Sequence, residues 1–162
     1  MKRVLKCPSL ALATALAVST PAHAQLIPDD EQPIDITGDS LEFVDDVATW
    51  VGNVRAVQGE AILTADRLVA TLGEDGGFTS IRAIGRVRYS NGREAIAGET
   101  ALYDATARAI TISDNVIVTQ GKTVMSGGAL VYWIDTGRIS FTSPGGRRIR
   151  GIFHTKAPPS AL

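Results

Sequence analysis

The chain of 162 residues has few of the side chains that enzymes and metal proteins use for their chemistry. It contains one cysteine and two histidines, and aromatic residues make up only 6% of it. Cys7 and His23 both lie within the first 24 residues, so His154 is the single histidine of the remainder. A disulfide, a thiolate site and a histidine-rich metal cluster are therefore excluded for residues 25–162. We expect neither a metal nor a cofactor.

The short motifs of common active sites are also missing. No Gly-x-Ser-x-Gly elbow is present, and no glycine-rich phosphate loop joins a strand to a helix. The acidic residues that could converge as a carboxylate pair for glycoside hydrolysis are Asp66, Glu94, Glu99 and Asp104. Their positions on alternating strands favour solvated side chains instead. We therefore do not expect an enzyme, and an exported polysaccharide-active enzyme is kept only as the weakest alternative.

Long apolar runs are absent as well, and the one near the start of the chain has the features of a leader. The apolar stretch 10–18 is too short for a membrane-spanning helix. Three cations precede it and Ala22-His23-Ala24 follows it, which is the pattern of a secretory signal peptide cleaved after Ala24. The sequence thus predicts a protein exported to the periplasm of a bacterium.

The predicted domain organisation follows from that leader. Residues 1–24 form the signal peptide, and 25–33 are expected to be a flexible N-terminal segment. One domain is predicted over 34–153, followed by a disordered tail over 154–162 that contains Pro158-Pro159.

Charge is distributed unevenly along the exported part. From 25 to 54 there are eight acidic residues and no basic residue, whereas from 137 onward there are five basic residues and no acidic one. Solvated ends would explain this distribution. Complementary poles that steer the molecule into head-to-tail contacts would explain it equally well. With its leader removed the chain is acidic overall, which together with export disfavours nucleic acid as a partner.

Apolar and polar residues alternate with a period of two over many short runs, such as Ile110/Ile112 and Val116/Val118, and turn-forming residues separate these runs. The pattern predicts an all-β fold of short strands. One phrase occurs twice, 62 positions apart: Gly52-Asn53-Val54 through Gln58-Gly59 returns as Asp114-Asn115-Val116 through Gln120-Gly121. A weaker copy begins at Gly85. Such repeats indicate one supersecondary unit laid down several times.

Several segments together resemble the LptA/OstA-like lipopolysaccharide-transport family. They are Gln32 to Ile36, Asp39-Ser40-Leu41, the two copies of the repeated phrase, Ala65-Asp66-Arg67-Leu68 and Gly98 to Tyr103. The resemblance covers about residues 32–142. It implies an open, twisted, antiparallel β-jellyroll, built here from short repeated strands, which binds lipopolysaccharide without enzymatic activity.

The resemblance further implies a function and partners. The family's role is to shield the lipid A acyl chains and to pass lipopolysaccharide from the inner to the outer membrane. The implied partners are an inner-membrane bridge component at one end, an outer-membrane translocon at the other, and possible further copies head to tail. By position in the family, Ile34, Ile36, Val87 and Tyr103 face the lipid.

Strand alternation adds further expected lining residues: Leu41, Phe43, Val54, Leu63, Leu68, Leu102, Ile112, Val116, Val118, Leu130, Tyr132 and Phe141. Trp50 and Tyr89 are also candidates, but a one-residue slip would turn either to the other face. A structural β-solenoid that polymerises through its ends without lipid remains the main alternative function.

Overall fold

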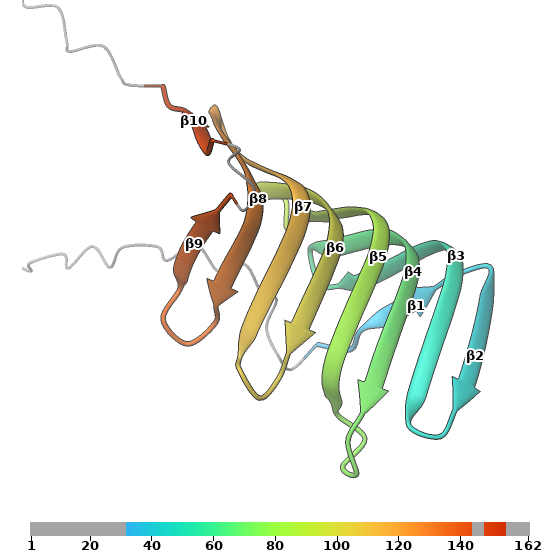
Figure 1. Ribbon diagram of the computed structural model, residues 1–162. Coiled ribbons are helices and arrows are strands. Elements are labelled where there is room, and N and C mark those ends of the chain that lie inside the picture. Colours follow the sequence, from blue (N-terminus) through green and yellow to red (C-terminus); the bar gives the residue numbers. More distant parts are fainter. Residues whose placement is uncertain (1–31, 144–147, 155–162) are drawn as a thin grey trace, which may run out of the picture.

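The computed structural model describes residues 32–143 and 148–154, and these form one open antiparallel sheet (Figure 1). The order of hydrogen-bonded strands is β1-β3-β4-β5-β6-β7-β8-β10, while β2 pairs with β3 and β9 pairs with β8. The strands are β1 (Asp35–Thr37), β2 (Ser40–Val44), β3 (Val47–Gln58), β4 (Ala61–Leu72), β5 (Phe78–Ser90), β6 (Glu94–Asp104), β7 (Ala109–Gln120), β8 (Thr123–Trp133), β9 (Arg138–Thr142) and β10 (Arg150–Ile152). The predicted all-β, open antiparallel fold is confirmed.

The predicted signal peptide, most of the N-terminal segment and residues 155–162 of the predicted tail lie outside the described residues, as does Arg147. Within the described part, no helix has the length and apolar character needed to cross a membrane.

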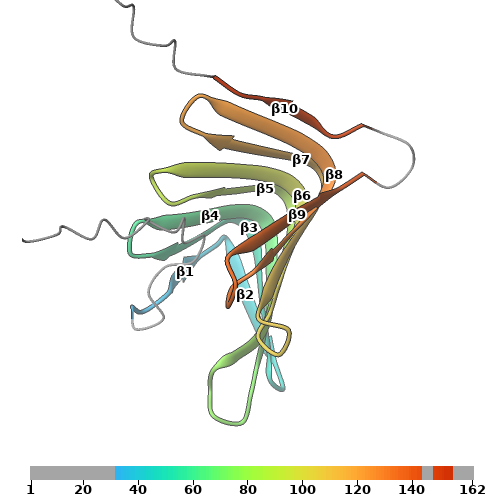
Figure 2. The ribbon, with the colours of Figure 1, turned by 90° about the vertical axis from the view of Figure 1, so that its left-hand side faces the viewer.

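Every long strand is bent near its middle, so that the sheet folds into a V (Figure 2). The pairing register shifts at the same level across the sheet: between Val51 and Val54 on β3, for example, and between Ser113 and Val116 on β7. We call this line of bends the crease. The β1 wall, on one side of it, comprises β1, β10 and the parts of β3 to β8 nearest them; the β2 wall, on the other side, comprises β2, β9 and the remaining parts.

The repeated phrase marks the crease. Gly52 and Asn53 have φ of 82° and 46°, and Asp114 and Asn115 have 64° and 55°. Pairs of left-handed residues form bulges that bend a strand without ending it. The expectation of short strands separated by turns at these sites is therefore wrong in this respect, because β3 and β7 each run for 12 residues through the bend.

The neighbouring strands cross the crease at a different kind of residue pair, a small residue followed by an acidic one or by a second glycine. On β4 and β6 the acidic residues of these pairs are Asp66 and Glu99, and Gly38-Asp39 is the corresponding pair between β1 and β2. Asn53 Nδ2 donates to Asp39 Oδ2 at 2.9 Å, which ties the first bend to the second. On the outside of the sheet, the Arg86 guanidinium forms an ion pair with Asp66.

The core lies on the inner faces of the two walls, near the crease. One cluster gathers around Val54, Leu68 and Ala70, and a larger one around Val87, Val116 and Leu130. Complete burial of a residue such as Leu68, which is 1% exposed, contributes about 1.5–3 kcal/mol. Buried alanines are frequent in this core. The walls therefore meet closely only at the crease and diverge above it.

Candidate functional site: an apolar groove between the walls

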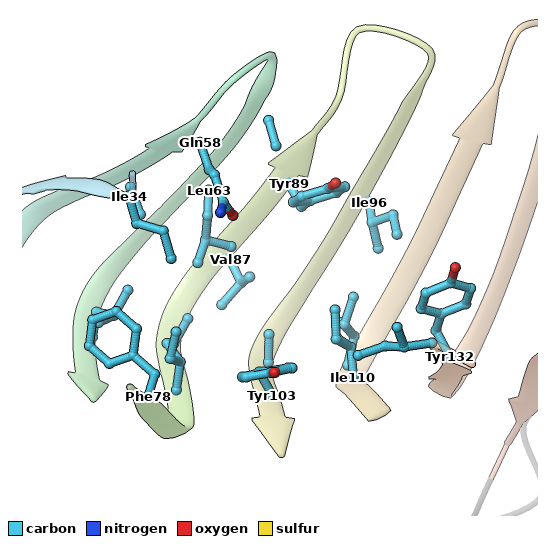
Figure 3. A pocket seen from close by; sticks show the side chains of 18 of the residues that line it. Ile34, Gln58, Leu63, Phe78, Val87, Tyr89, Ile96, Tyr103, Ile110 and Tyr132 are labelled. Atoms are coloured by element: carbon cyan, nitrogen blue, oxygen red, sulfur yellow. The ribbon is translucent and has the colours of Figure 1, made fainter. Parts of the chain in front are cut away.

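The space between the diverging walls is a groove with a cavity of about 720 Å³. In Figure 3, Leu63, Tyr89 and Ile96 project from the β1 wall, and Phe78, Tyr103, Ile110 and Tyr132 stand opposite them. Most of the lining is aliphatic or aromatic. A volume of this size and character suits an apolar ligand or part of one.

Strand pairing explains why these residues share one face. Tyr89 is opposite Ile96, Ile81 is opposite Tyr103, and Ile110 is opposite Tyr132. Directly paired residues project to the same side of a sheet, so the period-two pattern of each strand lines the groove with one set of side chains. Alanines such as Ala83 and Ala101 lie near the crease, where little space is available.

All three tyrosines of the chain line the groove. Burial raises the pKa of Tyr89 to about 12, with a further contribution from the negative charge of Glu94, while a hydrogen bond with Asn91 opposes the shift. Glu94 is itself buried and accepts a hydrogen bond from Gln120 Nε2 at 2.6 Å.

Two more polar contacts lie at the boundaries of the groove. Arg108 and Asp135 form an ion pair that joins the β6–β7 turn to the β8–β9 turn. On the β1 wall, Gln58 Nε2 donates to the carbonyl oxygen of Gln32 at 2.8 Å. The groove therefore has an apolar middle with polar groups near the strand ends.

The structure places most of the expected lining residues on the inner face. The groove itself is lined by Ile34, Ile36, Leu63, Leu68, Val87, Tyr103, Ile112, Leu130 and Tyr132. Four others belong to the core clusters on the same face or pack against them: Val54, Val116, Val118 and Phe141. Trp50 and Tyr89, whose parity was open, also pack against these clusters.

Leu102 differs from the expectation. It is paired with Arg82 and Thr111, and it lies between the inward-facing Ala101 and Tyr103, so it faces outward. At the bend, a step of three residues leads from the inward-facing Gly98 to the inward-facing Ala101, instead of the two of regular alternation, which changes the parity that the alternation suggested. Leu102 therefore does not line the groove.

Leu41 and Phe43 hold a different position from the other inward-facing residues. They pair with Trp50 and Ala48 and thus share the inner face, but they are 56% and 60% exposed, because β2 is an edge strand. They lie at the open end of the groove and not within it.

Several lining residues did not emerge from the sequence, among them Phe78, Ile81, Ile96 and Ile110. Ile110 is two residues from the predicted Ile112, and Ile81 is directly opposite the predicted Tyr103. Extending the period-two pattern to both ends of each strand would have found them.

The structure accounts for three of the four acidic residues considered for glycoside hydrolysis. Glu94 and Asp104 stand at opposite ends of β6, and Asp66 is engaged by Arg86 outside the crease. Asp104 Oδ1 accepts a hydrogen bond from the Ala107 backbone at 2.9 Å, which identifies it as a turn residue.

Both ends of the groove are bordered by edge strands with exposed apolar side chains. At the β1–β2 end these side chains are Leu41 and Phe43. At the β9–β10 end, four apolar side chains are 41–67% exposed: Ile139, Ile149, Ile152 and Phe153. The described charged residues follow the predicted polarity, with Asp35, Glu42 and Asp45 at the first end and Arg138, Arg148 and Arg150 at the second.

Comparison with known proteins agrees with this architecture. The family described as LptA/(LptD N-terminal domain) LPS transport protein matches residues 35–138. An uncharacterized protein of Rhizobium meliloti (strain 1021) is 31% identical over 151 residues, covering 86% of this chain and 81% of that protein. The lipopolysaccharide export system protein LptA of Escherichia coli (strain K12) is 28% identical over 154 residues, covering 89% and 83% respectively.

A solved structure is similar as well. The crystal structure of LptH from Pseudomonas aeruginosa, the LptA-homologous periplasmic component of the lipopolysaccharide transport device, has a TM-score of 0.69 and 23% identity. The match covers 80% of this chain and 100% of that one, and at this identity it concerns the fold. The family match spans the sheet from β1 to the start of β9 and confirms the resemblance found in the sequence. The chain belongs to the LptA/(LptD N-terminal domain) family of LPS transport proteins.

Proposed function

We propose that this protein is a non-enzymatic bridge that shields the acyl chains of lipid A and passes lipopolysaccharide across the periplasm, from the inner to the outer membrane, for outer-membrane assembly. The observation that carries the proposal is an apolar groove that ends at two edge strands on either side. A groove of this kind can be continued by a neighbouring molecule at both ends.

The energetics favour shielding over free diffusion. Each methylene that leaves an apolar environment for water costs about 0.8 kcal/mol, so a single chain of a dozen methylenes costs roughly 10 kcal/mol. Transfer between two similar grooves exchanges one apolar environment for another and is nearly neutral. The protein therefore needs no catalytic group, and the direction of transport comes from its partners.

The edges support the proposed partners. Unpaired edge strands are sites of strand addition, and exposed apolar side chains beside them are covered by the same contact. We assign one edge to an inner-membrane bridge component and the other to an outer-membrane translocon, with a second copy of the chain able to join head to tail. The acidic β1–β2 end and the basic β9–β10 end would attract each other in such a row.

Photo-crosslinking in cells that make lipopolysaccharide tests the proposal with a control one residue away. A photoreactive amino acid at Tyr103, inside the groove, should capture lipopolysaccharide, whereas the same group at Leu102, on the outer face, should not.

Capture at neither position by an exported, folded protein that still polymerises would favour the structural solenoid instead. Equal capture at both positions would mean that the groove is not the binding site. Glycan cleavage by the purified protein that is lost on replacing Asp66 or Glu99 would establish the enzyme alternative.

A further inference from the structure

One polar group inside the groove has no hydrogen-bonding partner among the residues that the structure describes. Tyr132 is 4% exposed, and its hydroxyl makes no hydrogen bond with any residue within 32–143 or 148–154. Buried tyrosines usually place the hydroxyl against a hydrogen-bonding partner. An isolated phenol in a buried position therefore points to a partner that enters from outside the chain.

The surroundings of Tyr132 make the absence of a partner more notable. Its strand neighbours on either side, Ile110 on β7 and Ile139 on β9, are aliphatic. Leu130 and Ile112 in the same cluster are aliphatic too. The Tyr89 phenol across the groove is near enough to interact with Tyr132 electrostatically, but no hydrogen bond between the two is present. Phenylalanine would therefore satisfy the packing around Tyr132 equally well. Phe78 and Phe141 occupy inner-face positions of the same wall without one.

The hydroxyl is nevertheless reachable from the groove. In Figure 3 the Tyr132 oxygen points away from the β2 wall, toward the space between the walls. Ser143 Oγ is the single fully enclosed, unpaired side-chain oxygen among the described residues, so the Tyr132 oxygen retains some accessible surface. A ligand in the groove can therefore contact it directly.

We propose that Tyr132 selects acyl chains that carry a hydroxyl group, by forming a hydrogen bond to that hydroxyl within the groove. This inference rests on the proposed function, since it assumes that acyl chains occupy the groove. An unsubstituted hydrocarbon would displace water from the phenol and leave it unpaired, which disfavours binding. A hydroxylated chain restores the hydrogen bond, and sites built this way discriminate against ligands that lack the group.

Tyr89 offers a matched control. It faces Tyr132 from the β1 wall and lines the same groove, but its hydroxyl already forms a hydrogen bond with Asn91. Removal of the Tyr89 hydroxyl should therefore leave the preference between ligands unchanged, whereas removal of the Tyr132 hydroxyl should abolish it.

The experiment measures the affinity of the purified chain for 3-hydroxytetradecanoic acid and for tetradecanoic acid by titration calorimetry, below the concentration at which either forms micelles. The unmodified protein should bind the hydroxylated acid roughly fivefold more tightly, the effect of one net hydrogen bond. Tyr132→Phe should bind both acids equally, with tetradecanoate bound at least as tightly as before. Tyr89→Phe, which also alters the lining of the groove, should change the affinity for both acids by the same factor and therefore keep the fivefold preference.

Other outcomes overturn the inference. If the unmodified protein binds both acids equally, or if Tyr132→Phe keeps the full preference, Tyr132 does not select a hydroxyl, while the proposed lipid-carrying function stands. If both tyrosine variants lose the preference, the assignment to Tyr132 is wrong. If neither acid binds at all, the proposed function fails, and this inference fails with it.

Discussion

The crease provides a direct test of how the groove is formed, through the substitution Gly85→Ala. Gly85 has φ of +79°, and a Cβ atom there would overlap the carboxylate of Asp66 on the neighbouring strand. It would also lie 3.0 Å from the Cβ of Asp66, which is fixed to the backbone and cannot rotate away. The substitution therefore forces the two strands apart where the sheet bends.

A second glycine separates this steric effect from backbone strain. Gly76, in the turn between β4 and β5, has φ of +80°, and a Cβ there would meet nothing within 4 Å. Gly76→Ala should cost only the left-handed conformation, about 1–2 kcal/mol. Gly85→Ala should cost that amount and a further 1–3 kcal/mol for overpacking, so we expect a total loss of about 2–5 kcal/mol.

Denaturant titration of both variants, followed by circular dichroism, measures the difference in unfolding free energy. Adding Asp66→Ala to Gly85→Ala removes the overlapping carboxylate and should recover part of the loss. Added to Gly76→Ala, the same change should be additive, because the two sites are not in contact. Equal losses in the two single variants would refute the view that close contact between strands holds the crease.

Three further effects follow from individual side chains. Because the pKa of Tyr89 is raised to about 12, its contribution to stability is complete below about pH 10 and is lost as the pH rises toward 12. Tyr89→Phe should therefore avoid about 1–2 kcal/mol of the alkaline loss of stability that the unmodified protein shows, a smaller value than for a fully buried phenol because the side chain is partly exposed to solvent. Denaturant titrations at several pH values measure this difference. A parallel decline in stability of both proteins would count against it. The ion pair with Arg86 lowers the pKa of Asp66, so its stabilisation is present above about pH 4 and is lost below; the acid limb of the stability profile should be flatter in Asp66→Asn. Leu68→Ala should lower the unfolding free energy by about 2–4 kcal/mol because it leaves a cavity in the core. Leu102→Ala on the outer face should lower it by only about 1 kcal/mol. A larger loss for Leu102→Ala than for Leu68→Ala would mean that the two faces are misassigned.

Local sequence predicted the class of fold well but misread the crease. Gly52-Asn53 and Asp114-Asn115 are also the residues of tight hairpin turns, since both structures require a positive φ. A hairpin turn and a bulge within a strand therefore look alike in one strand taken alone. Only the neighbouring strand distinguishes the two: a bulge within a strand requires that the neighbour also bends at the same level, as it does here at Asp66 and Glu99.

The candidate site shows the same division between local and non-local information. Alternation identified Leu63, Ile112 and Tyr132 as inward-facing, because parity is local to a strand segment. It failed for Leu102, because the parity beyond a bend depends on how many residues the bend inserts. That Tyr132 has no hydrogen-bonding partner within the described part of the chain is a property of the assembled groove and of no single strand, so no sequence pattern could reveal it.

The position of the crease has a consequence for the groove as a whole. The bends are made by backbone conformation at Gly52, Gly85 and Asp114 and by contacts outside the sheet, such as the pair between Asp66 and Arg86. The bends recur at the same level from β3 to β8, where the pairing register shifts. A strand that adds to either edge would extend a wall that already bends away from its partner at this level, so each open end of the groove can be continued by the next segment.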